Sequence, residues 1–137
     1  MDRFDARQRS RIMSTVRSKN TLPELLVRSI THKLGFRYSL HRKDLPGSPD
    51  LVFSSRRKVI FVHGCFWHQH AGCPRSKAPA TRQDYWLPKL EANRARDRRN
   101  TRHLQRLGWG VLIVWECELK DLDRLRKRIE GFLAPSA

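Results

Sequence analysis

Apolar and polar positions near the start of the chain follow the period of a helix. Thr21 stands in the place of an N-cap, and Glu24 follows three residues later, where an acidic side chain completes a capping box. The apolar positions that recur near helical spacing are Leu22, Leu25, Leu26, Ile30 and Leu34. The sequence therefore predicts a helix over residues 21–34, and capping is already a sufficient structural role for Glu24.

Four apolar runs are short enough to be strands. Residues 36–41 predict a short first strand, and residues 49–53 and 59–63 predict a hairpin joined by a polar turn. Residues 111–115 are all apolar, which is typical of a strand covered on both faces. The run at 49–53 has a carboxylate, Asp50, near its start. The run at 59–63 ends on an imidazole, His63, and thiol and aromatic groups follow it.

Two more helices complete the pattern, at residues 82–107 and 119–133. Pro88 predicts a boundary or a kink in the first of them. At about 100° per residue, Asp97 lies within roughly 40° of the face that carries Leu90 and Leu104. The order of elements predicts a single α/β domain, with helices on the faces of one sheet.

The charge of the chain narrows the class of partner. There are 29 Lys and Arg residues against 13 Asp and Glu residues, giving a formal net charge of +16. This balance favours a polyanion such as DNA. Residues 1–20 are especially basic and are interpreted as an arm lying along phosphates rather than a merely solvated tail. With no apolar run near the roughly 20 residues of a membrane span and no signal-peptide pattern, we expect a soluble intracellular protein.

The cysteines suggest a structural metal site. Cys65 and Cys73 flank a histidine-rich loop that contains His70, and Cys117 follows the last strand. Three sulfurs and one nitrogen fill a tetrahedral zinc site completely, which is typical of structural rather than catalytic zinc. Two alternatives remain open at this stage: three unrelated buried thiols, or His68 as the zinc ligand in place of His70.

A second set of residues fits hydrolytic chemistry. Asp50 begins one hairpin strand and His63 ends the next, so the two can be neighbours at one end of the sheet. A carboxylate and a backbone carbonyl suit Mg²⁺, and His63 or His68 could deprotonate water. Alternatively, Asp50 only caps a turn. Asp97 has two readings, as an ion-pair partner of Arg94 or as a partner for the site, and the second is preferred.

Three aromatic residues lie near this set. Phe66 and Trp67 are adjacent on the loop between a proposed zinc ligand and a proposed catalytic histidine, and Trp86 lies further along the chain. They fit a wedge inserted between base steps of DNA. Packing at the end of the hairpin is about equally consistent with the sequence.

The hairpin resembles that of PD-(D/E)xK nucleases, with Phe61 at the position of the second acid and His63 at that of the lysine. That variation is similar to the very short patch repair (Vsr) DNA mismatch endonucleases. The motifs that carry the resemblance are TLPE at 21–24, LPGSPD at 45–50, HGCFWH at 63–68, YW at 85–86, NRARD at 93–97, GW at 108–109 and VWEC at 114–117.

This resemblance implies a restriction-endonuclease-like mixed sheet in one domain, residues 21–137, behind the basic arm. It implies a Mg²⁺-dependent nick just 5′ of the thymine in T:G mismatches that arise by deamination of 5-methylcytosine. Double-stranded DNA with such a mismatch would be the substrate, and other mismatch-repair proteins would be further partners. We expect a monomer in the bacterial cytoplasm, associated with the nucleoid.

The resemblance also implies a role for each site residue. Asp50 and the backbone carbonyl of Val62 would hold Mg²⁺, which Glu24 would support through its water shell. His68 would be the general base, with His63 and Asp97 orienting water or phosphate. The remaining assignments are zinc binding by Cys65, His70, Cys73 and Cys117, and intercalation by Phe66, Trp67 and Trp86.

Two other functions are consistent with the sequence. One is a sequence-specific or junction-resolving nuclease of the same fold, and the other is a zinc-stabilised DNA-binding module without catalysis. The high positive charge supports all three functions equally, since any of them binds phosphates.

Overall fold

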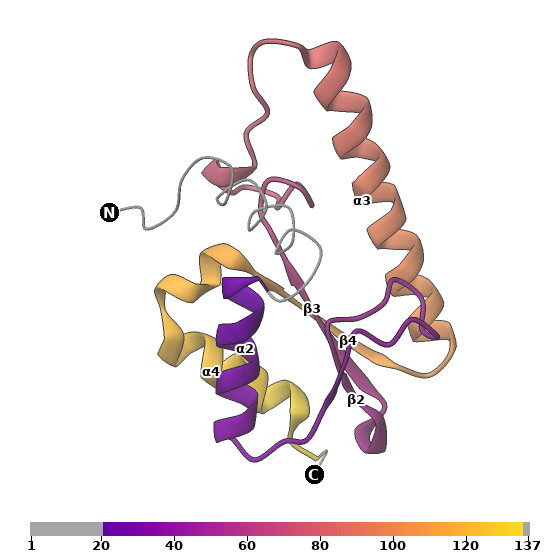
Figure 1. Ribbon diagram of the computed structural model, residues 1–137, viewed down its shortest axis with the longest axis vertical. Helices are drawn as coiled ribbons and strands as arrows, with labels where there is room; N and C mark the ends of the chain where they lie inside the picture. The colour runs from indigo at the N-terminus through magenta and orange to yellow at the C-terminus, as the bar shows by residue number, and fades with distance from the viewer. Residues whose placement is uncertain (1–20, 136–137) are drawn as a thin grey trace, which may run out of the picture.

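The computed structural model describes residues 21–135, so the predicted basic arm at 1–20 lies outside the described residues. Three helices surround a small sheet (Figure 1). The helices are α2 (Leu22–Lys33), α3 (Gln83–Arg106) and α4 (Leu122–Leu133), and the strands are β1 (Ser39–Leu40), β2 (Leu51–Phe53), β3 (Lys58–His63) and β4 (Gly110–Trp115). None of the helices in this range is long and apolar enough to cross a membrane.

The sheet is mixed, as the family resemblance implies, with strand order β1-β2-β3-β4. β1 and β2 are antiparallel, and so are β2 and β3, which form the hairpin. β3 and β4 are parallel and pair along their whole length, from Lys58 opposite Gly110 to His63 opposite Trp115. Their carboxyl ends therefore meet at one edge of the sheet, where His63 leads into the histidine-rich loop.

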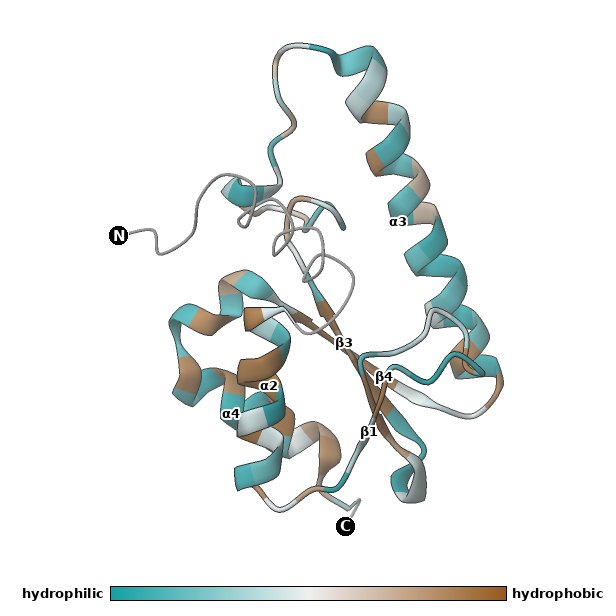
Figure 2. Cartoon of the chain, viewed as in Figure 1, coloured by the Kyte–Doolittle hydropathy of each residue, from teal (hydrophilic) through white to brown (hydrophobic). Residues whose placement is uncertain are grey.

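The two faces of the sheet bury different side chains, because neighbours along a strand point to opposite faces. On one face Leu51, Phe53 and Ile60 pack with residues of α2 and α4. On the other face Val52, Val59 and Phe61 pack with Leu104 of α3. Figure 2 shows the apolar sheet between α2 and α4 on one side and the largely hydrophilic α3 on the other.

Helix α2 begins as the sequence predicts, since the Thr21 hydroxyl accepts a hydrogen bond from the Glu24 N–H at 3.3 Å. Helix α3 is continuous over 24 residues with Pro88 inside it, so Pro88 does not divide it into two. A proline in the second turn removes one backbone hydrogen bond close to the helix end, where the loss is small.

Two predicted boundaries are wrong. The first strand is limited to Ser39–Leu40, because His41 has a positive φ of 48° and turns the chain away from the sheet. The last helix begins at Leu122, with Asp121 as its N-cap, and residues 116–120 form a separate 3₁₀ helix. That short helix positions Cys117 directly after β4.

Candidate active site and metal centre

Asp50 lies in a group of polar side chains from three elements. It precedes β2, and its Oδ2 accepts a hydrogen bond of 2.7 Å from the Val62 N–H in β3. Glu24 reaches the group from α2, and His41 reaches it from the end of β1. The His41 Nε2 lies 2.8 Å from Glu24 Oε2 and 4.0 Å from Asp50 Oδ1. Glu24 also pairs with Arg28 on its own helix.

The surroundings of Asp50 disfavour the ionised form of its carboxyl group. Burial raises the pKa of Asp50 to about 7, the N–H of Val62 opposes that rise, and the negative charge of Glu24 adds to it. Two carboxylates this close repel one another, and a divalent cation would relieve that repulsion. Carboxylate oxygens are also the ligands that Mg²⁺ prefers. The residues present therefore fit a hard divalent cation.

A second group of polar side chains contains His63, His68 and Asp97. The His68 Nδ1 lies 2.6 Å from the Oδ2 of Asp97, which extends from the middle of α3. The rings of His63 and His68 stack at 3.7 Å between centroids, with planes 7° apart. Arg94 pairs with Glu91 rather than with Asp97. The structure thus brings Asp97 to the histidines, as the preferred reading expects.

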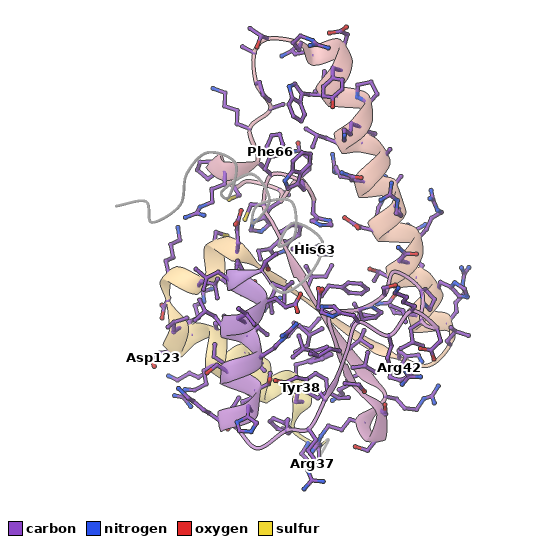
Figure 3. All side chains as sticks on the ribbon, in the orientation of Figure 1. Arg37, Tyr38, Arg42, His63, Phe66 and Asp123 are labelled. Carbon is purple, nitrogen blue, oxygen red and sulfur yellow. The ribbon has the colours of Figure 1, made fainter. Side chains whose placement is uncertain are left out.

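His63 is almost fully enclosed, with 6 % of its surface exposed. Burial, reinforced by the neighbouring His68, lowers the pKa of His63 to about 3. The ring is therefore neutral at ordinary pH, and it supports the ring of His68 from one side. Figure 3 shows His63 at the end of β3 and Phe66 beyond it on the loop.

Asp50 and His63 fall in separate groups rather than one, although both lie at the same end of the hairpin. Val62 connects them, since its N–H binds Asp50 and it immediately precedes His63. The expected direct contact between Asp50 and His63 is replaced by contacts of Asp50 with Glu24 and His41. His41 is the residue that the sequence reasoning missed.

An open hollow of about 610 Å³ lies between the histidine loop and α3. Its lining includes His63, His68, Asp97, Arg94, Arg98 and Arg102. The histidine group therefore faces a space with a basic wall, which suits a phosphate-bearing substrate.

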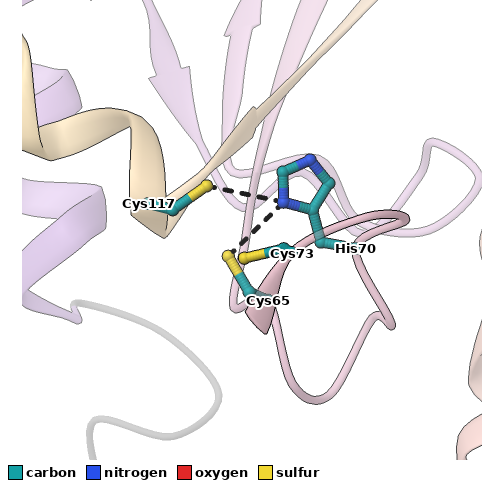
Figure 4. A group of neighbouring side chains, drawn as sticks. All are labelled: Cys65, His70, Cys73 and Cys117. Atoms are coloured by element: carbon teal, nitrogen blue, oxygen red, sulfur yellow. Dashed lines mark hydrogen bonds between the residues drawn. The ribbon is translucent and has the colours of Figure 1, made fainter. Parts of the chain in front are cut away.

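All four predicted zinc ligands lie together (Figure 4). The His70 Nδ1 is 3.4 Å from the Cys117 sulfur and 3.7 Å from the Cys65 sulfur. Cys73 completes the group. His68 is not part of it, because its Nδ1 pairs with Asp97. Three thiols and one imidazole form a donor set that fits zinc, whose ordinary structural site has four such ligands.

Neighbouring residues hold this group of four side chains in place. The His70 ring stacks on Trp115 with 4.2 Å between centroids. The carboxylate of Glu116 accepts a hydrogen bond of 3.1 Å from the Cys65 N–H. Trp115 ends β4 and Glu116 begins the 3₁₀ helix after it, so the group joins the loop after β3 to the segment after β4.

Phe66, Trp67 and Trp86 form one aromatic cluster between the loop and α3. Their ring centroids are 5.1 Å apart for Phe66 and Trp67, 5.5 Å for Phe66 and Trp86, and 5.9 Å for Trp67 and Trp86. All three are only partly buried. Asn93 of α3 donates to the Trp67 carbonyl at 3.2 Å, which fixes the loop against the helix.

Comparisons with known proteins show which family the chain resembles. The family model of the DNA mismatch endonuclease Vsr matches residues 1–74. The type II nicking enzyme V.XorIIP of Xanthomonas oryzae is 56 % identical over 135 residues, with 98 % of each chain covered. The DNA mismatch endonuclease Vsr of Escherichia coli is 44 % identical over 124 residues, covering 90 % of this chain and 79 % of that protein.

One solved structure supports the fold. The catalytic domain of the homing endonuclease I-Bth0305I aligns with a TM-score of 0.57 at 20 % identity, covering 82 % of this chain and 94 % of that one. The endonuclease fold expected from the hairpin is thereby confirmed. Together, the family match and the relatives show that this chain belongs to the Vsr family of DNA mismatch endonucleases.

Proposed function

We propose that the protein nicks one DNA strand just 5′ of the thymine in a T:G mismatch, in a reaction that requires Mg²⁺. One observation carries this proposal: the partly buried aromatic cluster of Phe66, Trp67 and Trp86 lies on the same loop and helix as His68 and Asp97. The aromatic cluster that would detect disrupted base stacking and the histidine that would accept a proton therefore lie at the same end of the sheet.

The aromatic cluster is the proposed mismatch reader. Unstacking a base step costs a few kcal/mol, and the cost is least at a mispaired step. Aromatic rings that enter the stack recover part of that cost. Phe66 and Trp67 come from the loop and Trp86 comes from α3, so the three rings form a wedge held from two sides.

Asp50 and the carbonyl of Val62 are the proposed ligands of Mg²⁺. Oδ2 of Asp50 accepts the Val62 N–H, and Oδ1 is the oxygen proposed to bind the cation. When bound, Mg²⁺ stabilises negative charge that develops on the phosphate. Glu24 is the proposed partner of water around the cation, because its carboxylate belongs to the same group.

His68 is the proposed general base. Asp97 accepts a hydrogen bond from Nδ1, which places the ring proton on that nitrogen and leaves the lone pair of Nε2 free. Nε2 takes one proton from a water molecule, and the resulting hydroxide forms a bond to phosphorus. The bond between phosphorus and the leaving oxygen breaks, and that oxygen takes a proton from solvent. His63 stays neutral and keeps the ring of His68 in plane.

Zinc is the proposed occupant of the group formed by the three cysteines and His70. Its role is structural, because protein side chains would fill every ligand position. It would tie the loop that carries Phe66, Trp67 and His68 to the end of β4. We further propose that the basic residues 1–20 contact phosphates and that the protein acts as a monomer.

A panel of duplexes tests the proposal. Each duplex carries one pair in an otherwise fixed sequence (T:G, U:G, C:G or T:A), with either strand labelled and with Mg²⁺ or EDTA. The surrounding sequence is randomised in parallel, and a four-way junction serves as a further substrate. The proposal expects a single cut 5′ of the mispaired thymine. Cutting of homoduplex or junction with equal efficiency would instead indicate a nuclease with another specificity.

A further inference from the structure

We propose that His41 is a positioning residue that holds Glu24 and Asp50 at the separation required by the divalent cation. This inference rests on the proposed function, because it concerns the same cation. It adds a residue that has no role in the family resemblance or in the relatives' names.

The backbone brings His41 to Asp50. Leu40 of β1 pairs with Leu51 of β2 in an antiparallel register, so the residue after Leu40 faces the residue before Leu51. His41 accordingly donates its backbone N–H to the Asp50 carbonyl at 3.3 Å. The positive φ of His41, 48°, ends the strand at that point and turns the chain. A left-handed conformation is uncommon in residues other than glycine, although histidine is among those that tolerate it better.

The side chain then returns to the carboxylates. Its Nε2 lies 2.8 Å from Glu24 Oε2, which is hydrogen-bonding distance, and 4.0 Å from Asp50 Oδ1. The imidazole therefore lies against both acids, with the bond to Glu24 as its direct contact. Helix α2 and the hairpin are joined at this point through His41.

Glu24 needs such a partner. Its side chain is 2 % exposed, and a buried carboxylate requires hydrogen bonds. Arg28 and His41 both contact Oε2 of Glu24. Arg28 lies on the same helix as Glu24. His41 directly follows β1, so its contact ties Glu24 to the sheet.

If His41 only stabilised the fold, any change that destabilises the fold equally would lower cation affinity by the same amount. A positioning role predicts a loss of affinity for the divalent cation that is specific to His41. Residues that orient ligands or their water shell typically change metal affinity by about 10- to 100-fold when they are removed. A donor of similar reach should restore it, and the amide of glutamine is such a donor.

The test uses the full chain as His41→Ala and His41→Gln, with His32→Ala as the matched control. His32 is an exposed histidine on the helix that carries Glu24. Mn²⁺ binding is measured without DNA, by calorimetry and by electron paramagnetic resonance, and the thermal midpoint of each zinc-loaded protein is recorded. Single-turnover cutting of a T:G duplex is then measured as a function of Mg²⁺ concentration.

The proposal expects His41→Ala to weaken Mn²⁺ binding about 10-fold or more and to shift the Mg²⁺ requirement upward by a similar factor. His41→Gln should stay within about threefold of the wild type, and His32→Ala should be unchanged. Normal Mn²⁺ binding by His41→Ala would overturn the proposal. Equal impairment of His41→Gln and His41→Ala would also overturn it, because the imidazole itself would then be required as a ligand.

These results are separable from the proposed function. If the wild type binds Mn²⁺ and His41→Ala weakens that binding, but the wild type does not cut T:G duplexes, the positioning role stands and the mismatch activity fails. If the wild type cuts and His41→Ala binds and cuts normally, the mismatch activity stands and the positioning role fails.

Discussion

The Nδ1 atom of His68 lies 2.6 Å from the Oδ2 atom of Asp97, although 29 residues separate the two in sequence. The contact joins the loop after β3 to the middle of α3. It selects the tautomer of His68 that leaves Nε2 able to accept a proton. The geometry makes His68 the candidate base and Asp97 the residue that orients it.

Replacing Asp97 by Asn should impair the chemical step more than DNA binding. The amide can donate to Nδ1 and stabilise the wrong tautomer, so we expect the single-turnover rate to fall on the order of 10²- to 10⁴-fold. The affinity for a T:G duplex should change by less than about threefold, because Asp97 contacts His68 and is not part of the aromatic cluster. Parallel loss of affinity and rate would argue against an orienting role.

Replacing Asp50 by Asn should abolish cutting and stabilise the cation-free protein. Burial raises the pKa of Asp50 to about 7, so the folded protein holds a proton that the unfolded chain releases from about pH 4 upward. The Asp50 contribution to stability therefore decreases as pH rises from about 4 through 7. At pH 8 without divalent cation, we expect Asp50→Asn to raise the free energy of unfolding by about 2 kcal/mol.

Denaturant unfolding at pH 5 and pH 8 measures this effect, with EDTA at a concentration low enough to leave zinc bound. The advantage of Asp50→Asn should be smaller at pH 5. It should also shrink when Mg²⁺ is added, because the cation stabilises only the ionised wild type. A variant that is less stable than the wild type at pH 8 would contradict the assigned environment of Asp50.

Removal of zinc should destabilise the domain. We expect about one zinc per chain by elemental analysis, and a strong chelator should lower the thermal midpoint by more than about 10 °C, because structural zinc contributes directly to folding. Cys73→Ser should lose the metal, whereas His103→Ala, a change at an exposed position on α3, should retain it. A zinc-free protein with an unchanged thermal midpoint would show that the fold does not depend on a structural metal.

Truncation of the aromatic wedge should reduce discrimination. Trp67→Ala removes a ring that contacts both Phe66 and Trp86. Stacking of a base on an aromatic side chain contributes about 1 to 3 kcal/mol, so T:G affinity should fall roughly 5- to 150-fold. Binding to matched duplex should change little. Tyr85→Ala, next to Trp86 but more exposed, is the comparison variant. An equal loss on both duplexes would identify the cluster as packing alone.

The sequence predicted the parts of the fold that depend on local patterns. Apolar runs identified the four strands and three helices, because burial of one face imposes a helical or an alternating period. It could not show that β1 ends at Leu40, since the positive φ of His41 depends on its tertiary contacts. For the same reason, the pattern predicts a closing helix from residue 119, although residues 116–120 form a separate 3₁₀ helix.

The candidate site was predictable to a similar degree. The close spacing of Cys65, His70 and Cys73 indicated a metal group, which Cys117 joins through the parallel pairing of β3 and β4. The partners of Asp50 were harder to foresee, because Glu24 reaches it only through the packing of α2 against the sheet. The contact of His41 with Asp50 follows from the β1–β2 register, which the sequence alone does not fix.

We propose that this chain cuts one strand next to the mispaired thymine and uses Asp50 and His68 to do so. The most direct measurement is single-turnover cleavage of a T:G duplex with Mg²⁺, mapped to the nucleotide on each labelled strand, for the wild type, Asp50→Asn and His68→Ala. We predict one wild-type cut 5′ of the thymine and a loss of at least about 100-fold in both variants, with T:G binding retained. Wild-type cutting that ignores the mismatch, or full activity in either variant, would contradict this mechanism.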